Sequence, residues 1–303
     1  MKVYYPEQFD VPLPVGHRFP IEKYAMLHKK VKEYQQLNSF DLCEAPAASD
    51  AQISQVHTKD YLYRILNGEL SDREIRRIGF PWSLDLVRRA RQTVGGTIAA
   101  CQAAIQEGYA ANLAGGTHHA HADHGAGFCV FNDVAIAART MQAEGDIERV
   151  VILDCDVHQG DGTAAVFHSD PSVFTFSIHG AKNFPHRKVP GDLDIELADG
   201  CDDGTYLSAL QAGIRCALEA FQADLAIFIA GADPYEHDRL GRLAVTKMGL
   251  SKRDSYVIDM CREFKLPIAV VMGGGYSNLV EDTVDIYMET IQVLIKASIC
   301  KNW

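Results

Sequence analysis

The sequence predicts an α/β fold: a doubly wound, mostly parallel sheet flanked by helices. Short, continuous apolar runs, typical of parallel strands buried on both faces, recur along the chain. Longer segments with helical spacing lie between them, and this alternation implies right-handed crossovers between parallel strands. Because no repeat or low-complexity linker divides the 303 residues, we expect one domain that spans residues 1–303.

The expected elements follow in chain order. Residues 1–80, approximately, are more helical and less regular than the rest, and we interpret them as a helical cover on the same domain. The expected strands are residues 111–114, 150–154, 173–177, 225–230 and 268–272. The expected helices are residues 84–106, 134–143, 205–223, 251–264 and 283–296. Asp203 is the candidate N-cap of the third helix, and Ser251 or a neighbour that of the fourth.

Composition and charge exclude some classes of function. Hydrophobic residues make up 47% of the chain and charged residues 23%, which is typical of a soluble globular protein. The formal net charge is -11, so we do not expect nonspecific binding of nucleic acid, which needs clustered basic residues. The same acidic balance could attract a basic peptide by electrostatic steering.

The sequence contains no segment that resembles a membrane span or a signal peptide. No apolar run approaches the ~18–20 residues that span a bilayer. Residues 1–10 mix Tyr, Pro and charges and lack the apolar core of a signal peptide, so we expect a cytoplasmic protein. The eight cysteines, Cys300 among them, are scattered without a C-x-x-C pair. Neither disulfides nor a cysteine zinc site is therefore expected.

Polar residues gather where the expected strands end, which is where ligands bind in open parallel sheets. Asp156 and His158 occupy alternate positions after strand 150–154, and Asp233 follows strand 225–230. Carboxylate oxygens and an imidazole nitrogen suit a divalent cation such as Zn²⁺, and three protein ligands leave a position for water. Taken singly, each residue is better explained by a helix cap, a structural cation or a packed or solvated histidine. Together they indicate a metal site.

A second group of residues suits acid–base chemistry. His118 and His119 lie on a glycine-rich turn, and histidine is the side chain whose pKa lies nearest neutrality. Asp154 and Asp161 are the carboxylates available to orient the two imidazoles. Tyr276 follows three glycines and could donate its hydroxyl to the oxyanion that forms in amide hydrolysis. The histidines expected to be solvated are His121, His124, His168, His186 and His237.

Five motifs, taken in order, resemble the histone deacetylase family of the arginase–deacetylase fold. They are G-G-T-H-H-A at 115–120, G-A-G-F-C-V-F-N-D at 125–133, D-C-D-V-H-Q-G-D-G at 154–162, G-A-D at 231–233 and G-G-G-Y at 273–276. The match runs from about Asp10 to the last expected helix. Gln159, the D-R-L-G run at 238–241 and the stretch 183–192 resemble the class IV branch or its bacterial relatives.

The resemblance implies roles for the catalytic positions. The implied zinc ligands, with Fe²⁺ as an alternative metal in the cell, are Asp156, His158 and Asp233. His119 would be the general base and then the general acid, backed by Asp161. His118, backed by Asp154, would be its electrostatic partner, and Tyr276 would clamp the carbonyl oxygen.

The resemblance also implies a substrate tunnel. Gly127 would offer its backbone carbonyl to the substrate amide, and Phe128 would line one wall, with Phe184 opposite. Leu240 aligns with the tunnel mouth, and Gly274, in the glycine run, is assigned to substrate binding. A structural potassium ion would bind behind the metal site through backbone oxygens near Asp154, Asp156 and His158 and the side chain of Ser177.

The resemblance predicts a zinc-dependent hydrolase of acyl-lysine amides, with acetyl or longer acyl groups. A rival is an amidohydrolase of small acyl-amines such as acetylpolyamines, whose relatives carry an acidic gatekeeper where this chain has the neutral Leu240. Glu236 lies close in sequence and could reach the rim. A second rival is a non-catalytic acyl-lysine-binding module, whereas an arginase-type two-metal hydrolase lacks its extra aspartates here. The sequence leaves acyl length and oligomeric state open.

Overall fold

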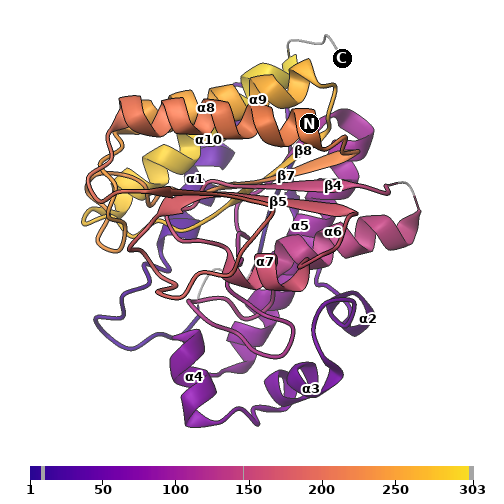
Figure 1. Ribbon diagram of the computed structural model, residues 1–303. Helices are drawn as coiled ribbons and strands as arrows, with labels where there is room; N and C mark the ends of the chain where they lie inside the picture. Colours follow the sequence, from indigo (N-terminus) through magenta and orange to yellow (C-terminus); the bar gives the residue numbers. More distant parts are fainter. Residues whose placement is uncertain (8–10, 146, 300–303) are drawn as a thin grey trace.

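One sheet of eight strands lies at the centre of the computed structural model, which describes residues 1–7, 11–145 and 147–299 (Figure 1). Asp10 and Cys300 lie outside these residues. The strands are β1 Lys2–Tyr5, β2 Asp41–Glu44, β3 Tyr109–Asn112, β4 Val150–Asp154, β5 Val173–Gly180, β6 Leu193–Leu197, β7 Leu225–Ala230 and β8 Ile268–Met272. Their order is β2-β1-β3-β8-β7-β4-β5-β6, and every pairing among the described strands is parallel. The predicted doubly wound α/β fold is confirmed.

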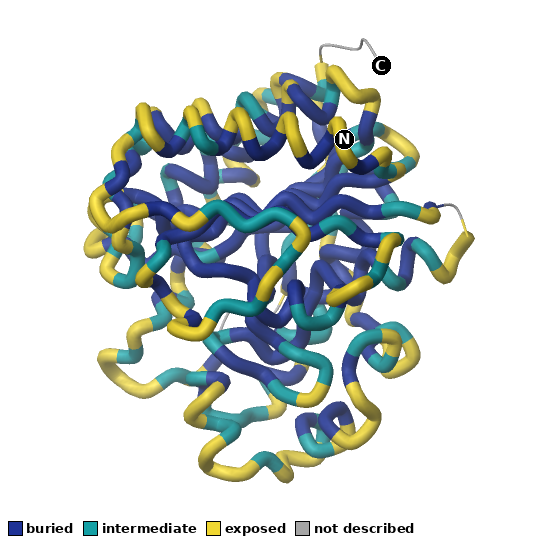
Figure 2. Tube along the Cα trace, in the orientation of Figure 1, coloured by how far each residue is buried: buried dark blue, intermediate teal, exposed yellow. Residues whose placement is uncertain are grey.

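Helices cover both faces of this sheet. The helices are α1 Lys23–Gln35, α2 Asp50–Ile53, α3 Lys59–Asn67, α4 Asp72–Ile78, α5 Leu84–Glu107, α6 Asp133–Glu144, α7 Asp161–Val166, α8 Asp203–Ala220, α9 Lys247–Glu263 and α10 Val280–Ile299. α1, α8, α9 and α10 pack on one face. α5, α6 and α7 lie on the other, with α2, α3 and α4 beyond them in Figure 1. Figure 2 shows the strands as the most deeply buried layer.

Each central strand supplies side chains to two apolar layers. In β4, Val151 and Leu153 belong to the core beneath α8, α9 and α10, whereas Val150 and Ile152 belong to the core beneath α5 and α6. Successive side chains of a strand point to opposite faces, so a strand between two helical layers is apolar throughout. Burying each such side chain stabilises the fold by roughly 1.5–3 kcal/mol. Continuous apolar runs therefore mark the central strands.

The edge strands lack this signal, and the interpretation of residues 1–80 as a helical cover is wrong in that respect. β1 and β2 lie within this segment, pair with each other, and extend the sheet from β3. β6, with the sequence L-D-I-E-L, forms the opposite edge beside β5. A strand at the edge of a sheet keeps polar, partly exposed side chains, so its apolar run is short or interrupted. β3 also begins two positions earlier than expected, at Tyr109.

The helix caps differ from the expected ones. Asp202, not Asp203, caps α8, and its side chain accepts a hydrogen bond from the Thr205 backbone N–H. Asp203 instead accepts hydrogen bonds from the backbone N–H and the hydroxyl of Thr246, both at 2.7 Å. Thr246 is itself the cap of α9, which begins at Lys247 and not near Ser251. The two aspartates therefore tie the start of α8 to the start of α9.

Among the described residues, no helix combines the length and the apolar character needed to cross a bilayer. The seven cysteines within this part of the chain all carry free thiols, and five of them are buried: Cys101, Cys129, Cys155, Cys201 and Cys261. A buried thiol of this kind packs as a small hydrophobic group.

The cap of α9 generates the first prediction. Thr246→Ala removes the hydroxyl that accepts from the Gly249 N–H at 3.0 Å and donates to Asp203. We expect it to lower the free energy of unfolding by about 1–2 kcal/mol, measured by chemical denaturation. The control is Ser251→Ala, inside α9, which should cost about 0.5 kcal/mol or less because its hydrogen bond to Glu289 is partly exposed. A larger loss for Ser251→Ala than for Thr246→Ala would contradict this assignment.

Candidate metal centre and active site

The candidate functional side chains lie on loops that follow four neighbouring strands. These loops carry His118 and His119 after β3, Asp156 and His158 after β4, Asp233 after β7 and Tyr276 after β8. β3, β8, β7 and β4 are adjacent and parallel, so their carboxyl ends meet at one edge of the sheet. The topology thus brings together residues that are far apart in the sequence.

Asp156, His158 and Asp233 form one buried cluster of candidate metal ligands, called the metal cluster below. One ligand atom from each residue lies within 4.8 Å of the others. The His158 Nδ1 is 3.0 Å from Asp156 Oδ1 and 3.1 Å from Asp233 Oδ2. Gly274 approaches so closely that a Cβ at this position would lie 1.9 Å from Asp233 Oδ2. Two carboxylates and one imidazole are ligands that bind Zn²⁺, and they also bind Fe²⁺. The residues present therefore fit a catalytic divalent metal.

The cluster concentrates negative charge inside the protein. Burial and the neighbouring Asp156 carboxylate raise the pKa of Asp233 to about 7. Burial also opposes ionisation of Asp156, but His118 and His158 outweigh it and hold the Asp156 pKa below its usual range. Burial lowers the pKa of His158, but hydrogen bonds to the two carboxylates raise it overall to about 10. Without a metal, a proton on His158 offsets part of this charge.

Two histidine–aspartate pairs lie beside the cluster. His118 Nδ1 is 2.6 Å from Asp154 Oδ2, and His119 Nδ1 is 2.6 Å from Asp161 Oδ1. The centroids of the two imidazole rings are 4.1 Å apart. A carboxylate at Nδ1 fixes the tautomer and the ring orientation, which leaves Nε2 of each ring available for other partners.

The two pairs differ in charge at neutral pH. Burial lowers the pKa of His118, but Asp154 and Asp156 outweigh it and raise this pKa to about 9. Burial and the charge on His118 lower the pKa of His119 to about 4, although Asp161 acts in the opposite direction. His118 therefore carries a proton on both nitrogens, and His119 can accept one. Titratable neighbours with separated pKa values are typical of acid–base catalysis.

Tyr276 is positioned through its backbone. Its N–H donates to Asp238 Oδ2 at 2.6 Å, and its carbonyl accepts from Arg239 Nε at 2.9 Å. Asp238 also accepts from the backbone N–H groups of Leu240 and Gly241. Burial raises the pKa of the Tyr276 phenol well above its ordinary value, so the hydroxyl remains a hydrogen-bond donor. In sequence, the D-R-L-G run marks only a resemblance to one branch of the family, and no local pattern reveals that Asp238 and Arg239 position Tyr276.

A strained loop carries Gly127 and Phe128. Phe128 has a φ of 65°, which is rare for a bulky residue. Gly127 has a φ of 54°, and a Cβ there would lie 2.5 Å from His119 Cδ2. The N–H groups of Gly127 and Phe128 donate to the backbone carbonyls of Arg77 and Ile78 at the end of α4. This helix end therefore helps to hold the loop in its strained conformation.

Two buried cations donate hydrogen bonds to the loops that follow β4, β7 and β8. Lys23 donates to the backbone carbonyl just before Tyr276, and burial lowers its pKa to about 8. Arg253 is paired with Asp254 and donates to the carbonyls of Cys155 and Gly231, in the two loops that carry the candidate metal ligands. No local motif marks either cation, because α1 and α9 bring them from outside the segments that contain the ligands.

Three spaces share lining residues around this site. The mouth, with a cavity volume of about 820 Å³, is lined by Phe128, Phe184, Leu240 and Tyr276 among others. The Phe184 ring lies edge-on to the His119 ring, with centroids 4.8 Å apart. A narrower pocket follows at the metal cluster, where Gly127, Phe128 and Gly274 lie among its lining residues. Phe128 also borders the innermost space.

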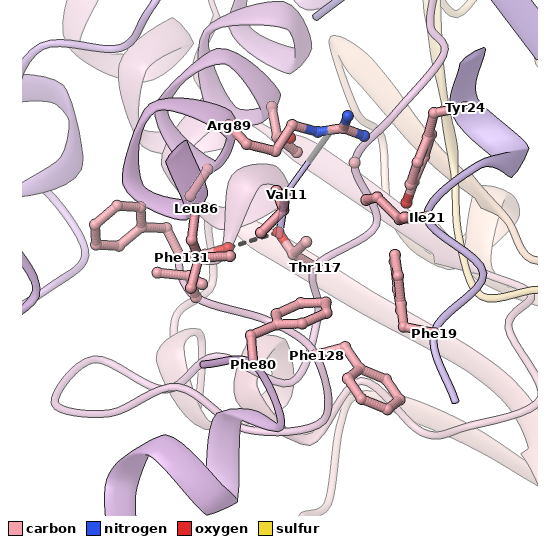
Figure 3. A pocket seen from close by; sticks show the side chains of 14 residues that line it. Val11, Phe19, Ile21, Tyr24, Phe80, Leu86, Arg89, Thr117, Phe128 and Phe131 are labelled. Carbon is pink, nitrogen blue, oxygen red and sulfur yellow. Dashed lines mark hydrogen bonds between the residues drawn. The ribbon is translucent and has the colours of Figure 1, made fainter. Parts of the chain in front are cut away.

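The innermost space is an apolar cavity of about 60 Å³ (Figure 3). In this view Phe19, Phe80 and Phe128 lie near one end, and Tyr24 and Arg89 near the other. The Arg89 guanidinium lies 4.1 Å from the centroid of the Tyr24 ring. Residues shared with the pocket at the metal cluster are Phe19, Tyr24, Gly115, Thr117 and Phe128. Apolar space therefore extends beyond the metal cluster.

The expectation that His121 is solvated is wrong. Its Nε2 is 3.2 Å from Asp161 Oδ2, so it is a second partner of the carboxylate that holds His119. His124 is half-buried rather than solvated, because its ring stacks on that of His121 at 4.6 Å and its Nδ1 lies 2.6 Å from Asp123. The exposed histidines are His168, His186 and His237, of which His186 lines the mouth.

Comparison with known proteins agrees with this geometry. Residues 17–291 match the model of the histone deacetylase domain. The chain belongs to the histone deacetylase family. It is 43% identical over 282 residues to an uncharacterized protein of Picosynechococcus sp., covering 93% of this chain and 94% of that protein. The family resemblance of the motifs is therefore confirmed.

Named relatives of this histone deacetylase family member are more distant. Histone deacetylase 2 of Arabidopsis thaliana is 29% identical over 271 residues, covering 86% of this chain and 70% of that protein. The acetoin utilization protein AcuC of Bacillus subtilis is 30% identical over 252 residues, covering 76% and 65%. The crystal structure of the HDA15 HD domain superposes with a TM-score of 0.81 at 22% identity, covering 97% and 88%. This likeness shows the fold, and the family relationship suggests deacetylase activity.

The metal cluster of this deacetylase family member generates the second prediction. At pH 7, a pKa of about 10 leaves His158 protonated in the metal-free protein, and a pKa of about 7 leaves Asp233 partly protonated. Ligation requires a neutral imidazole and an ionised carboxylate, so we expect Zn²⁺ binding to release about one to two protons. Calorimetric titration in buffers with different ionisation enthalpies measures this number. His168→Asn, a change of an exposed histidine, should leave it unchanged. A binding enthalpy that does not vary with buffer would contradict the prediction.

Proposed function

We propose that this protein is a zinc-dependent deacylase that hydrolyses the amide of acyl-lysine in peptides or proteins. The observation that carries the proposal is the convergence of the metal cluster, the two histidine–aspartate pairs and Tyr276 on one buried pocket below the mouth. Each part has a chemical role in amide hydrolysis, and the family relationship points to the same reaction.

Asp156, His158 and Asp233 would hold the zinc ion. When bound, the ion would make water more acidic and polarise the acyl carbonyl. The close packing of Gly274 against both carboxylates supports this assignment, because it excludes a side chain that would separate them. Fe²⁺ would fit the same donors.

His119 would act first as the general base. Its low pKa, about 4, keeps it neutral at pH 7, and Asp161 at Nδ1 leaves Nε2 free to accept the proton of the attacking water. The same nitrogen would then return the proton to the leaving lysine amine. His118, with a pKa of about 9, would contribute a positive charge beside the reacting groups.

Tyr276 would donate its hydroxyl to the developing oxyanion. Its phenol stays protonated because burial raises its pKa, and its backbone is fixed by Asp238 and Arg239. A donor held in place before the reaction does not need to reorganise in the transition state. Gly127 would accept the substrate amide N–H on its carbonyl, and Phe128 and Phe184 would enclose the lysine side chain.

The innermost cavity would receive the acyl chain. One water requires roughly 10–15 Å³ of such space, so about 60 Å³ accommodates a few methylene groups beyond the acyl carbonyl. The walls of Phe19, Phe80 and Val11 favour an apolar chain. We therefore propose acetyl and somewhat longer acyl groups as substrates.

A structural potassium ion would lie behind the metal cluster. The small pocket there is lined by Asp154 and Ser177, which are directly paired in neighbouring strands. Carbonyl and carboxylate oxygens at strand ends suit a hard cation. It would help to fix the loop that carries Asp156 and His158.

An amidohydrolase of acetylpolyamines is the weaker candidate. Leu240 lines the mouth, as the resemblance of the motifs implies, whereas Glu236 is not among the residues that line it. A cationic polyamine would therefore meet no carboxylate at the mouth formed by the described residues. A non-catalytic binding module would not require a separated pair of histidine pKa values.

The third prediction concerns Tyr276. We expect Tyr276→Phe to lower kcat on an acetyl-lysine peptide by about 10²- to 10³-fold, with an unchanged unfolding midpoint, because only the oxyanion donor is lost. Release of free lysine from the peptide measures turnover in the zinc-loaded protein. Tyr63→Phe, at a position that is 57% exposed, is the matched control and should retain full activity. The chelator-stripped protein should be inactive and recover with added Zn²⁺.

Unchanged turnover in Tyr276→Phe would reject this role for the phenol. Hydrolysis of acetylspermidine without hydrolysis of any acyl-lysine peptide would favour the polyamine enzyme. Binding of acyl-lysine peptides by the zinc-loaded protein without lysine release would favour the binding module.

The fourth prediction concerns the length of the acyl group. Ala90 lies on α5 and lines the innermost cavity, so Ala90→Phe should fill part of it. We expect the ratio of kcat/KM for hexanoyl-lysine to that for acetyl-lysine to fall about tenfold or more, because overpacking costs roughly 1–3 kcal/mol. Ala223→Phe, at a half-buried position before β7 and outside this cavity, is the control. An unchanged ratio in Ala90→Phe would exclude this cavity as the acyl site.

A further inference from the structure

The mouth of the pocket carries an excess of positive charge. Its charged lining residues are all basic and all exposed: Arg18, Arg76, Arg77, Lys182, Arg239 and Arg242. Within the described part of the chain, no Asp or Glu lines this mouth. The whole sequence contains 40 acidic and 29 basic residues. The mouth therefore has a charge opposite in sign to that of the protein.

Among the described residues, few carboxylates neutralise these basic side chains. Asp199 lies 3.2 Å from Arg242 and 3.5 Å from Lys182, so one carboxylate serves two cations. Arg239 donates to backbone carbonyls, which orient its guanidinium without removing its charge. Arg76 and Arg77 form no ion pair with any described residue. Most of the positive charge is thus available to a ligand.

The fold places part of this charge beside the tunnel wall. Arg76 and Arg77 lie in the last turn of α4, whose end is hydrogen-bonded to the loop of Gly127 and Phe128. Arginine at a helix C-terminus also offsets the helix dipole, which by itself would account for these two residues. The helix dipole does not account for the cations on the loops after β5 and β7, which line the same mouth. Separate segments converge here with one sign of charge.

We propose that this basic rim selects acyl-lysine in polypeptide segments where acidic residues flank the acylated lysine. The inference rests on the proposed function, because the acyl-lysine side chain has to enter the tunnel for its neighbours to reach the rim. Successive residues of an extended peptide are ~3.3–3.6 Å apart, so residues one or two positions from the lysine lie over the mouth. Asp or Glu at these positions gains ion pairs, and Lys or Arg is repelled.

This selection is the reverse of what the overall charge suggests. A net charge of -11 favours approach of a basic peptide at long range, but the groups that contact the residues beside the lysine are cationic. Exposed charges farther apart than the Debye length, ~10 Å at 0.1 M salt, are screened. The charges that contact the substrate at short range therefore determine which flanking residues are preferred.

The test compares three peptides that carry the same acetyl-lysine and differ only in flanking residues: all Glu, all Gln or all Lys. We expect kcat/KM with the zinc-loaded protein to be about five- to twentyfold higher for the Glu than for the Gln peptide, and lowest for the Lys peptide. The difference should lie mainly in KM and should shrink at 1 M salt, where the Debye length is ~3 Å.

Variants assign the effect to the rim. Arg76→Gln/Arg77→Gln and, separately, Arg242→Gln should each lower the Glu-to-Gln ratio by about two- to fivefold. Arg76→Lys/Arg77→Lys keeps the charge and should preserve most of the ratio. The control is Lys252→Gln on α9, an exposed cation outside the mouth, which should leave the ratio unchanged.

The outcomes separate this inference from the proposed function. If the protein hydrolyses none of the three peptides, the deacylase proposal fails. If it hydrolyses the Gln peptide and does not prefer the Glu peptide, the selection by the rim is overturned and the deacylase proposal stands. If the three peptides have equal kcat/KM values and a short RNA inhibits the hydrolysis of all three equally, the rim is a nucleic-acid site. This result would also overturn the selection of acidic peptides.

Discussion

Burial of three carboxyl groups at one edge of the sheet is the constraint on which the rest of the site depends. Asp154, Asp156 and Asp233 are each at most 3% exposed, and an unpaired carboxylate at such a depth is very costly. Compensation comes from three buried basic groups: His118, His158 and Lys23. Because Lys23 belongs to α1, the packing of this helix is electrostatically linked to Asp156 and Asp233.

The loops that carry the chemistry are held by contacts with one another, not by the strands alone. Asp238 joins the loop after β7 to Tyr276 in the loop after β8. Asp133, at the start of α6, accepts hydrogen bonds from the backbone of Gly116 and Thr117, just before the histidine pair. Such cross-links fix the candidate catalytic groups in place, and groups held in place before substrate binds are a main source of catalysis in enzymes.

The sequence predicts the central strands and the site residues that lie in contiguous motifs. It does not predict features that depend on contacts between residues far apart in the chain. β4 and β7 are recognisable because both of their faces are buried, whereas β1 and β6 lie at or near sheet edges and keep polar residues. The structure brings together the expected ligand, histidine and tyrosine positions. Lys23 and Arg253 could not be found, because a buried cation on a helix has no local pattern. The charge of the mouth was hidden for the same reason, since it is assembled from segments that are separate in the chain.

The left-handed backbone of Phe128 has a consequence for protein engineering. The Phe128 ring packs so closely on Gly79 that a Cβ at position 79 would lie 2.9 Å from the ring. Position 127 is limited to glycine in the same way, because a Cβ would clash with His119. Positions 79, 127 and 128 therefore form a coupled unit in which single replacements change backbone strain together with tunnel shape. Phe184 on the facing wall packs on the His119 ring, but its backbone lies outside the left-handed region and the residue is 39% exposed. A mutant library that aims to alter substrate preference without loss of folding should start from Phe184.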